Sequence, residues 1–382
     1  MKLTQTLTVA SIALAFSAAA QAQQSSVTLF GLVDAGLGYN SISAPNESSK
    51  SNLGATSGVS RPTTFGIRGV ESLGNGNSVV FNLTSQFNLG NGAVATDGFF
   101  GQQATLGVRN ERYGQVDLGR QTNLASKYFQ SIDPFSTFYG QAGMGGSFGT
   151  TNNLRYSNMV MYQTSSWNGL SGGIGYSFNT GLPGAYADSG VVTGATTNFG
   201  TTNNPRALTV GLNYANGPLQ VAATYDQIMP ANNIGNGDNT TPKSWILGAA
   251  YDFKVVKASL AYGQTRGGAI SGTLPSAVSG INSNWAAGGA LYEGGYGANS
   301  YLVGLSAPIT STQRAFASYQ LATPTGSANV AANGNQSIYS VGYEYSFTKR
   351  TTAYAYASYA NNYLMLDGAK STAVGVGMRH AF

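Results

Sequence analysis

The last twelve residues of the chain, Ser371 to Phe382, alternate between large and small side chains. The large, mostly apolar set is Val374, Val376, Met378, His380 and Phe382. Because successive side chains of a β-strand point to opposite faces, this pattern predicts a strand with one apolar face. An unpaired strand that ends on an aromatic residue would invite aggregation. A barrel whose last strand pairs with its first has no open edge, so this ending favours a closed barrel.

The same alternation recurs along the chain. Ser337 to Phe347 carries Tyr, Val or Phe at every second position, and Thr351 to Ala360 follows after a short turn. Similar runs lie at 78–88, 208–214, 219–226, 244–254 and 256–263. A soluble β-sandwich would use an inner face rich in Ile and Val, whereas this chain places Tyr and Phe near strand ends, as an aromatic girdle requires. We therefore predict an all-β fold, a transmembrane antiparallel β-barrel of about sixteen strands.

Two kinds of link join the predicted strands. Short links with hairpin residues lie at 75–76, 110–114, 168–169, 216–217 and 348–350. Long links rich in Asn, Ser, Thr and Gly lie at 40–60, 180–204, 230–242 and 267–298. Alternating short and long links are typical of outer-membrane barrels, which have short periplasmic turns and long external loops.

The composition agrees with a barrel and excludes other classes. Only 9% of the residues are charged, and cysteine is absent. The chain beyond Ala22 has no run of about 18 consecutive apolar residues, so no membrane-spanning helix is predicted. The formal charge of +5 is small for 382 residues, and no basic run occurs. A nucleic-acid partner is therefore not expected.

The N-terminus predicts export. Lys2 is followed by an apolar stretch of small residues and Leu, and Ala20-Gln21-Ala22 fits an A-x-A cleavage site. We expect a cleaved signal peptide over residues 1–22 and a single barrel over 23–382.

Enzyme chemistry is not expected. The chain has one histidine, His380, which belongs to the apolar set of the last strand. Because that single histidine is expected to face lipid and cysteine is absent, a Ser-His-Asp triad, a Cys nucleophile and a His-ligated zinc site are not expected. No phosphate-binding or dinucleotide-binding motif occurs. We predict no catalytic residues, no metal and no cofactor.

Four motifs carry a family resemblance. They are SSVTLFGLVDAGLGY (25–39), FGIRGVESLGNG (65–76), GQVDLGRQ (114–121) and GMRHAF (377–382). In this order they resemble stretches of the general trimeric porins of β-proteobacteria, of the Burkholderia, Bordetella and Neisseria type. The resemblance implies a homotrimer in the outer membrane that contacts outer-membrane lipid and lets ions and small hydrophilic solutes diffuse passively. It also implies that the barrel-assembly machinery reads the terminal Phe382.

The resemblance further implies a constriction loop. In the family the third external loop folds into the lumen, and here it corresponds to about Leu124 to Thr151. Arg68 on a wall strand, Arg155 after the loop and Asp133 within it are the expected constriction charges. Thr64, Thr84 and Gln102 stand where the family pattern has charged residues. These departures imply a more neutral constriction than is common in the family.

Aromatic residues of the loop have two interpretations. Tyr128, Phe129, Phe135, Phe138, Tyr139 and Phe148 either pack the loop against the wall or line a path for solutes. The second interpretation fits a substrate-specific channel. A further alternative is an adhesin or receptor barrel whose external loops, such as 267–298, bind a partner.

Overall fold

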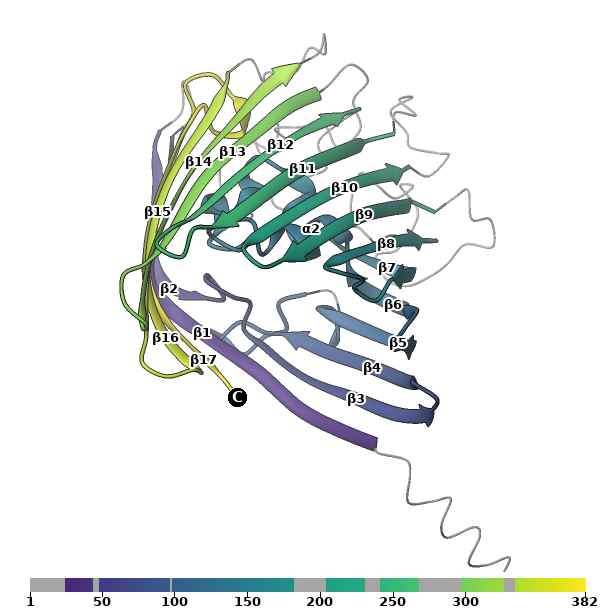
Figure 1. Cartoon of the computed structure of the whole chain (residues 1–382). Helices are drawn as coiled ribbons and strands as arrows, with labels where there is room; N and C mark the ends of the chain where they lie inside the picture. Colours follow the sequence, from purple (N-terminus) through teal and green to yellow (C-terminus); the bar gives the residue numbers. More distant parts are fainter. Residues whose placement is uncertain are drawn as a thin grey trace, which may run out of the picture.

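The computed structural model describes residues 25–43, 48–96, 98–181, 204–230, 241–267, 297–325 and 334–382. Their 17 strands form a single antiparallel sheet that closes on itself (Figure 1). The strands are β1 (Ser25–Ser43), β2 (Lys50–Ser57), β3 (Thr64–Gly74), β4 (Asn77–Gln86), β5 (Gln103–Asn110), β6 (Gly114–Thr122), β7 (Arg155–Gln163), β8 (Leu170–Ser177), β9 (Arg206–Asn216), β10 (Leu219–Met229), β11 (Lys243–Asp252), β12 (Lys257–Arg266), β13 (Gly297–Pro308), β14 (Gln313–Thr325), β15 (Gln336–Ser346), β16 (Thr351–Asn361) and β17 (Lys370–Ala381).

The barrel has sixteen wall positions because β2 and β3 occupy one of them. β2 pairs with the second half of β1, from Ala35 to Ile42, and β3 pairs with the first half, from Ser25 to Leu32. The intervening residues, Gly58 to Thr63, leave the sheet. Each other strand is hydrogen-bonded to its neighbours in chain order. The predicted closed antiparallel barrel of about sixteen strands is therefore confirmed.

The seam of the barrel lies where the alternating C-terminal residues predicted it. β17 pairs with β1 from Leu32 opposite Ala381 to Ser43 opposite Lys370. Beyond this ladder, Phe382 N–H donates to Gly31 O at 3.0 Å, and Gly31 N–H donates to Phe382 O at 3.2 Å. The last residue thus completes the hydrogen bonds of the first strand, and the closure leaves no free edge there.

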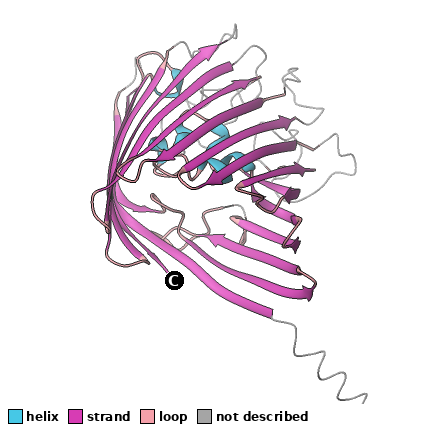
Figure 2. Cartoon of the chain, in the orientation of Figure 1, coloured by secondary structure: helices cyan, strands magenta, loops and turns pink. Residues whose placement is uncertain are grey.

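The two faces of the wall differ as the alternation requires. On β17, the outward residues Val376 and Met378 are 53% and 52% exposed. Ala373, which points to the other face of the same strand, is buried. The inward face packs against the short helices that Figure 2 shows inside the ring of strands. In the part of the chain that the structure describes, no helix is long and apolar enough to cross a membrane.

One predicted loop is wrong. Most of the described residues between 40 and 60 are in strands: β1 continues to Ser43, and Lys50–Ser57 returns beside it as β2. These two segments are rich in Asn, Ser and Thr. A strand made of such residues has no apolar face, so a search for alternating apolar residues does not detect it. The short turns expected at Asn75-Gly76, Asn168-Gly169 and Asn216-Gly217 are confirmed. The predicted signal peptide and most residues of the other three long links lie outside the described residues.

Candidate functional site

A long loop between β6 and β7 enters the barrel. It spans residues 123–154 and contains the helix α2 (Leu124–Phe129) and three 3-10 turns, η1 (Gly140–Ala142), η2 (Met144–Gly146) and η3 (Gly149–Thr151). Asn123 caps α2, because its side-chain oxygen accepts a hydrogen bond from Ser126 N–H at 3.3 Å. The loop lies close to the predicted range of 124–151, and it narrows the lumen from within (Figure 2).

Most loop aromatics pack the loop against the wall. Phe129, Phe135, Tyr139 and Phe148 are each at most 2% exposed. Their clusters include wall residues from several strands: Ala222, Ile246, Ala250, Ala261, Leu302, Phe316, Tyr354 and Tyr356. These rings therefore hold the loop in place by apolar burial. Tyr128 and Phe138 are only partly buried and remain at the loop surface.

Side-chain hydrogen bonds fasten the loop to strands around the ring. Asn123 donates to Asp226 of β10 at 2.8 Å, and Gln320 of β14 donates to Ala142 O at 3.0 Å. Further bonds reach β13, β15, β16 and β17 and involve the pairs Ser300–Ser147, Gln336–Gly146, Gln141–Ser358 and Ser371–Gln141. A loop tied at so many separate strands is a fixed part of the lumen wall.

Asp133 organises the loop from inside. Its side chain is 3% exposed, and its carboxylate accepts N–H groups of Phe135 at 3.0 Å and of Thr137 and Met144 at 2.7 Å each. Burial raises the pKa of Asp133 to about 6, although these three N–H donors and the charge of Arg61 oppose the shift. Asp133 therefore holds the turn of the loop together and does not face the solute path.

Asp133→Asn should loosen the loop. An amide presents an NH₂ group toward backbone N–H donors, so we expect a loss of about 1–3 kcal/mol in loop stability. Greater open-channel current noise in single-channel recordings would register this change, and noise equal to that of the wild type would contradict it.

The same variant tests a pH dependence. Because the pKa of Asp133 is raised in the folded loop, its protonation stabilises the loop fully below about pH 4, and this stabilisation is lost as the pH rises through about 6. Wild-type current noise should therefore increase between pH 4 and 6. Asp133→Asn keeps the other acidic groups and should show a flat profile over that range.

A cluster of charges faces the tip of the loop, and we call it the eyelet cluster: Arg61, Arg314, Arg379, Asp34 and Glu344. Glu344 of β15 lies at its centre. Its carboxylate binds Arg379 Nη1 at 2.6 Å and Arg314 Nη2 at 3.0 Å. The same group accepts the hydroxyl of Tyr139 at 2.7 Å. Burial and the charge of Glu344 raise the pKa of the Tyr139 hydroxyl, so Tyr139 remains a donor that links the loop to the cluster.

The segment between β2 and β3 supplies the other side of the cluster. Asp34 of β1 accepts Ser60 N–H at 2.8 Å, Arg61 N–H at 2.9 Å and the Tyr354 hydroxyl at 2.6 Å. These bonds hold Arg61 beside the loop, where its guanidinium lies 4.5 Å from the ring centre of Phe138. The break in the wall between β2 and β3 thus places a cation next to the loop tip.

Arg68 lies on the lumen side of β3 but far from the eyelet cluster. It is opposite Thr28 of β1, and its guanidinium stands 5.1 Å from the ring centre of Phe30. Asp34 is six residues further along β1, a separation of roughly 20 Å in a strand. Arg68 therefore belongs to the end of the lumen near the short β3–β4 turn.

Arg155 stands at the start of β7, beside the end of the loop. Its neighbour Tyr156 is buried with Leu124 of α2, and Arg155 itself is half-buried. Its Nη1 donates to Asn153 O at 3.1 Å, and the charge of Arg120 on β6 lies nearby. The structure therefore does not bring Arg68, Arg155 and Asp133 together, and their role in limiting conduction stays a prediction.

None of the five residues of the eyelet cluster is among the site residues predicted from the sequence. Glu344 and Arg379 lie on the small or polar faces of clearly alternating strands, which was the available signal. In a chain with 9% charged residues, each charge on such a face is a candidate for the lumen. Three guanidinium groups and two carboxylates surround the loop tip, and the expectation of a constriction more neutral than is common in the family stays a prediction.

Comparisons with known proteins agree with this architecture. Residues 7–363 match the model of a family described as Gram-negative porin. The chain belongs to the Gram-negative porin family. It is 45% identical to an outer membrane porin protein of Bordetella pertussis, over 99% of this chain and 100% of that protein. It is 29% identical to outer membrane porin protein 32 of Delftia acidovorans, over 97% of each chain.

Solved porin structures have the same fold. An anion-selective porin from Comamonas acidovorans superposes with a TM-score of 0.71 at 25% identity, over 94% of this chain and 100% of that one. A trimer form of OmpT from Vibrio cholerae superposes with a TM-score of 0.60 at 14% identity, over 94% and 99%, which shows the fold alone. The predicted resemblance to β-proteobacterial porins is confirmed, and the chain is a porin of the Gram-negative outer membrane.

Proposed function

We propose that this porin is a homotrimeric, water-filled channel through which ions and small hydrophilic solutes diffuse passively, with a preference for anions. A barrel of about sixteen strands is wide enough to leave an aqueous channel. The observation that carries the preference is the eyelet cluster, in which guanidinium groups outnumber carboxylates beside the loop that narrows the lumen.

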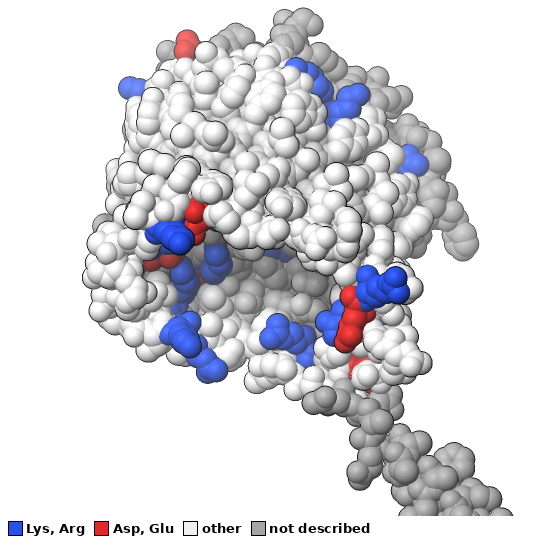
Figure 3. All heavy atoms as spheres, in the orientation of Figure 1, with Lys and Arg blue, Asp and Glu red and all other residues white. Residues whose placement is uncertain are grey.

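Electrostatics favour anions at this place. Fixed charges in a narrow, low-dielectric channel set ion preference because the walls focus the field. Figure 3 shows a hollow in the molecule around which Lys and Arg atoms predominate over Asp and Glu atoms. The related Comamonas acidovorans structure is that of an anion-selective porin, which supports the same sign for this chain.

A channel accounts for the described residues better than an enzyme does. Within the described ranges, no group of three or more His, Cys, Asp or Glu side chains is placed to hold a metal ion. The carboxylates beside the loop are engaged by arginines, tyrosines and backbone N–H groups. Their arrangement supports a structural and electrostatic role. The trimer is supported by family membership and by the trimer form among the structural neighbours.

Liposome swelling tests passive diffusion directly. Liposomes containing the purified porin should swell at rates that fall smoothly as the size of an uncharged sugar increases. Swelling should be faster with a small organic anion than with a cation of equal size. A saturable rate for one solute, with exclusion of others of the same size, would instead identify a substrate-specific channel. No swelling with a folded barrel would favour the adhesin or receptor alternative.

A further inference from the structure

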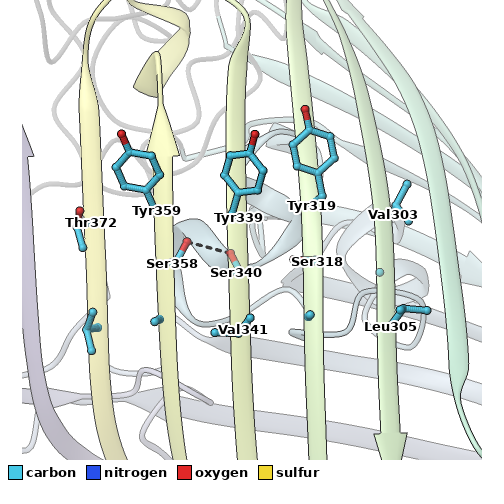
Figure 4. Close-up of a pocket in the computed structure, with 14 residues that line it drawn as sticks. Val303, Leu305, Ser318, Tyr319, Tyr339, Ser340, Val341, Ser358, Tyr359 and Thr372 are labelled. Carbon is cyan, nitrogen blue, oxygen red and sulfur yellow. Dashed lines mark hydrogen bonds between the residues drawn. The ribbon is translucent and has the colours of Figure 1, made fainter.

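The outer face of the wall carries a groove that the channel function does not use. It has a volume of about 540 Å³ and crosses the five strands β13 to β17. Four spacings between neighbouring strands make it roughly 19 Å long. Its lining is almost entirely apolar, and it opens outward where the porin meets lipid (Figure 4).

Strand register builds this groove from two rows of outward side chains. The tyrosine row consists of Val303, Tyr319, Tyr339, Tyr359 and Thr372. The alanine row lies two residues from the tyrosine row on each strand, on the side of the short turns. It consists of Leu305, Ala317, Val341, Ala357 and Val374. Ala317 and Ala357 are the small members between larger neighbours, so the surface is recessed at their positions.

The tyrosine row forms one rim of the groove. Figure 4 shows the three tyrosine rings standing side by side with their hydroxyl groups pointing in the same direction, away from the alanine row. The rings of Tyr319 and Tyr339 are 5.1 Å apart, and the Tyr319 hydroxyl lies 3.3 Å from Ser337 Oγ. Tyrosines at this position are typical of the boundary between hydrocarbon and headgroups.

A polar row lies beyond the tyrosines. Ser337 is opposite Asn361, and Asn361 is opposite Lys370 on β17. This row adjoins the link between β16 and β17, which is longer than the turns at the other end of these strands. Long links are external, so Lys370 and its neighbours face the outer leaflet. Lys370 is exposed there and supplies a positive charge above the groove.

The order of these rows matches the order of groups in an anionic lipid. A cation and hydroxyl groups stand at the headgroup level, tyrosine rings stand at the interface, and an apolar groove continues below them. We propose that the groove holds an acyl chain of a phosphorylated lipid of the outer leaflet, whose phosphate is bound by Lys370. A contact with a second copy of the chain would not require this order, and the charge of Lys370 favours a phosphate over a neutral headgroup.

Native mass spectrometry of the detergent-purified porin tests the proposal, with bisphosphorylated lipid A as the probe. We expect one retained lipid per protomer. Filling the groove with Ala317→Leu and Ala357→Leu should lower retention at least fivefold, since leucine stays compatible with lipid but occupies the recess. The matched control is Ala223→Leu with Ala249→Leu, on the outward faces of β10 and β11, which should bind as the wild type does.

A second variant tests the headgroup. Lys370→Gln should weaken retention about fivefold, the effect of one basic residue near an anionic lipid. Lys349→Gln at the opposite end of the barrel should change nothing, and dephosphorylated lipid A should bind the wild type as weakly as lipid A binds Lys370→Gln. Equal retention in all variants, or equal binding of the dephosphorylated lipid, would overturn the proposal. Fewer trimers in the groove-filling variant would also overturn it, because the groove would then be a contact between subunits.

Discussion

Replacing both Arg61 and Arg314 by Gln will abolish most of the anion preference of the channel. Each guanidinium contributes a unit charge beside the loop, and such a charge acts on a passing ion at about 4 Å with roughly 1 kcal/mol even at the dielectric constant of water. Losing two removes about 2 kcal/mol of attraction for chloride and should lower the chloride-to-potassium permeability ratio roughly thirtyfold. Arg379 is left in place because it binds Glu344 at 2.6 Å and helps to hold the loop.

Two single variants are the matched controls. Arg68→Gln and Arg155→Gln remove the same charge from places outside the eyelet cluster, and each should change the permeability ratio less than twofold. At about 0.1 M salt the Debye length is roughly 10 Å, so the charge of Arg68, which is paired with Thr28 roughly 20 Å along β1 from Asp34, is largely screened at the eyelet cluster. If either control has the larger effect, the narrowest charged section of the channel lies elsewhere.

Deleting Phe382 should lower the yield of folded porin in the outer membrane at least tenfold. The deletion removes both hydrogen bonds between Phe382 and Gly31 and opens the end of the seam. It also removes the aromatic end group that, by resemblance to the family, the barrel-assembly machinery reads. Heat-modifiable trimers in purified outer membranes, quantified on gels, measure this yield.

Phe382→Ala separates the two contributions. It keeps the backbone hydrogen bonds of the seam and removes only the ring, so it should reproduce most of the loss if the ring is the recognised feature. Met378→Ala truncates another exposed, outward side chain of the same strand and should assemble normally. A normal yield of Phe382→Ala would assign the effect of the deletion to the seam alone.

The architecture could be predicted from the sequence because it depends on local periodicity. Alternation along Ser371 to Phe382 predicted an outward apolar face and the pairing of the last strand with the first, and both are found. The hairpin at Asn216-Gly217 followed from residues that tolerate a positive φ. The one misread link, 40–60, has no apolar alternation because both of its strands are polar.

The eyelet cluster could not be predicted in the same way. Arg61 lies hundreds of residues before Glu344 and Arg379 along the chain, and the three meet only through the register of a closed sheet. Asp133 could be recognised as the only acid of the loop, but its burial depends on backbone N–H groups that fold around it. A resemblance between motifs predicts which positions carry functional residues. The distances between the side chains at those positions can be known only from the folded structure.

The most direct test of the proposed function is the reversal potential of single channels of the purified protein in a planar bilayer under a KCl gradient. An anion-preferring trimeric porin should give current steps that close in threes and a reversal potential displaced toward the chloride equilibrium potential. A displacement toward the potassium equilibrium potential would contradict the role of the eyelet cluster. The absence of conductance from a correctly folded barrel would contradict the channel itself.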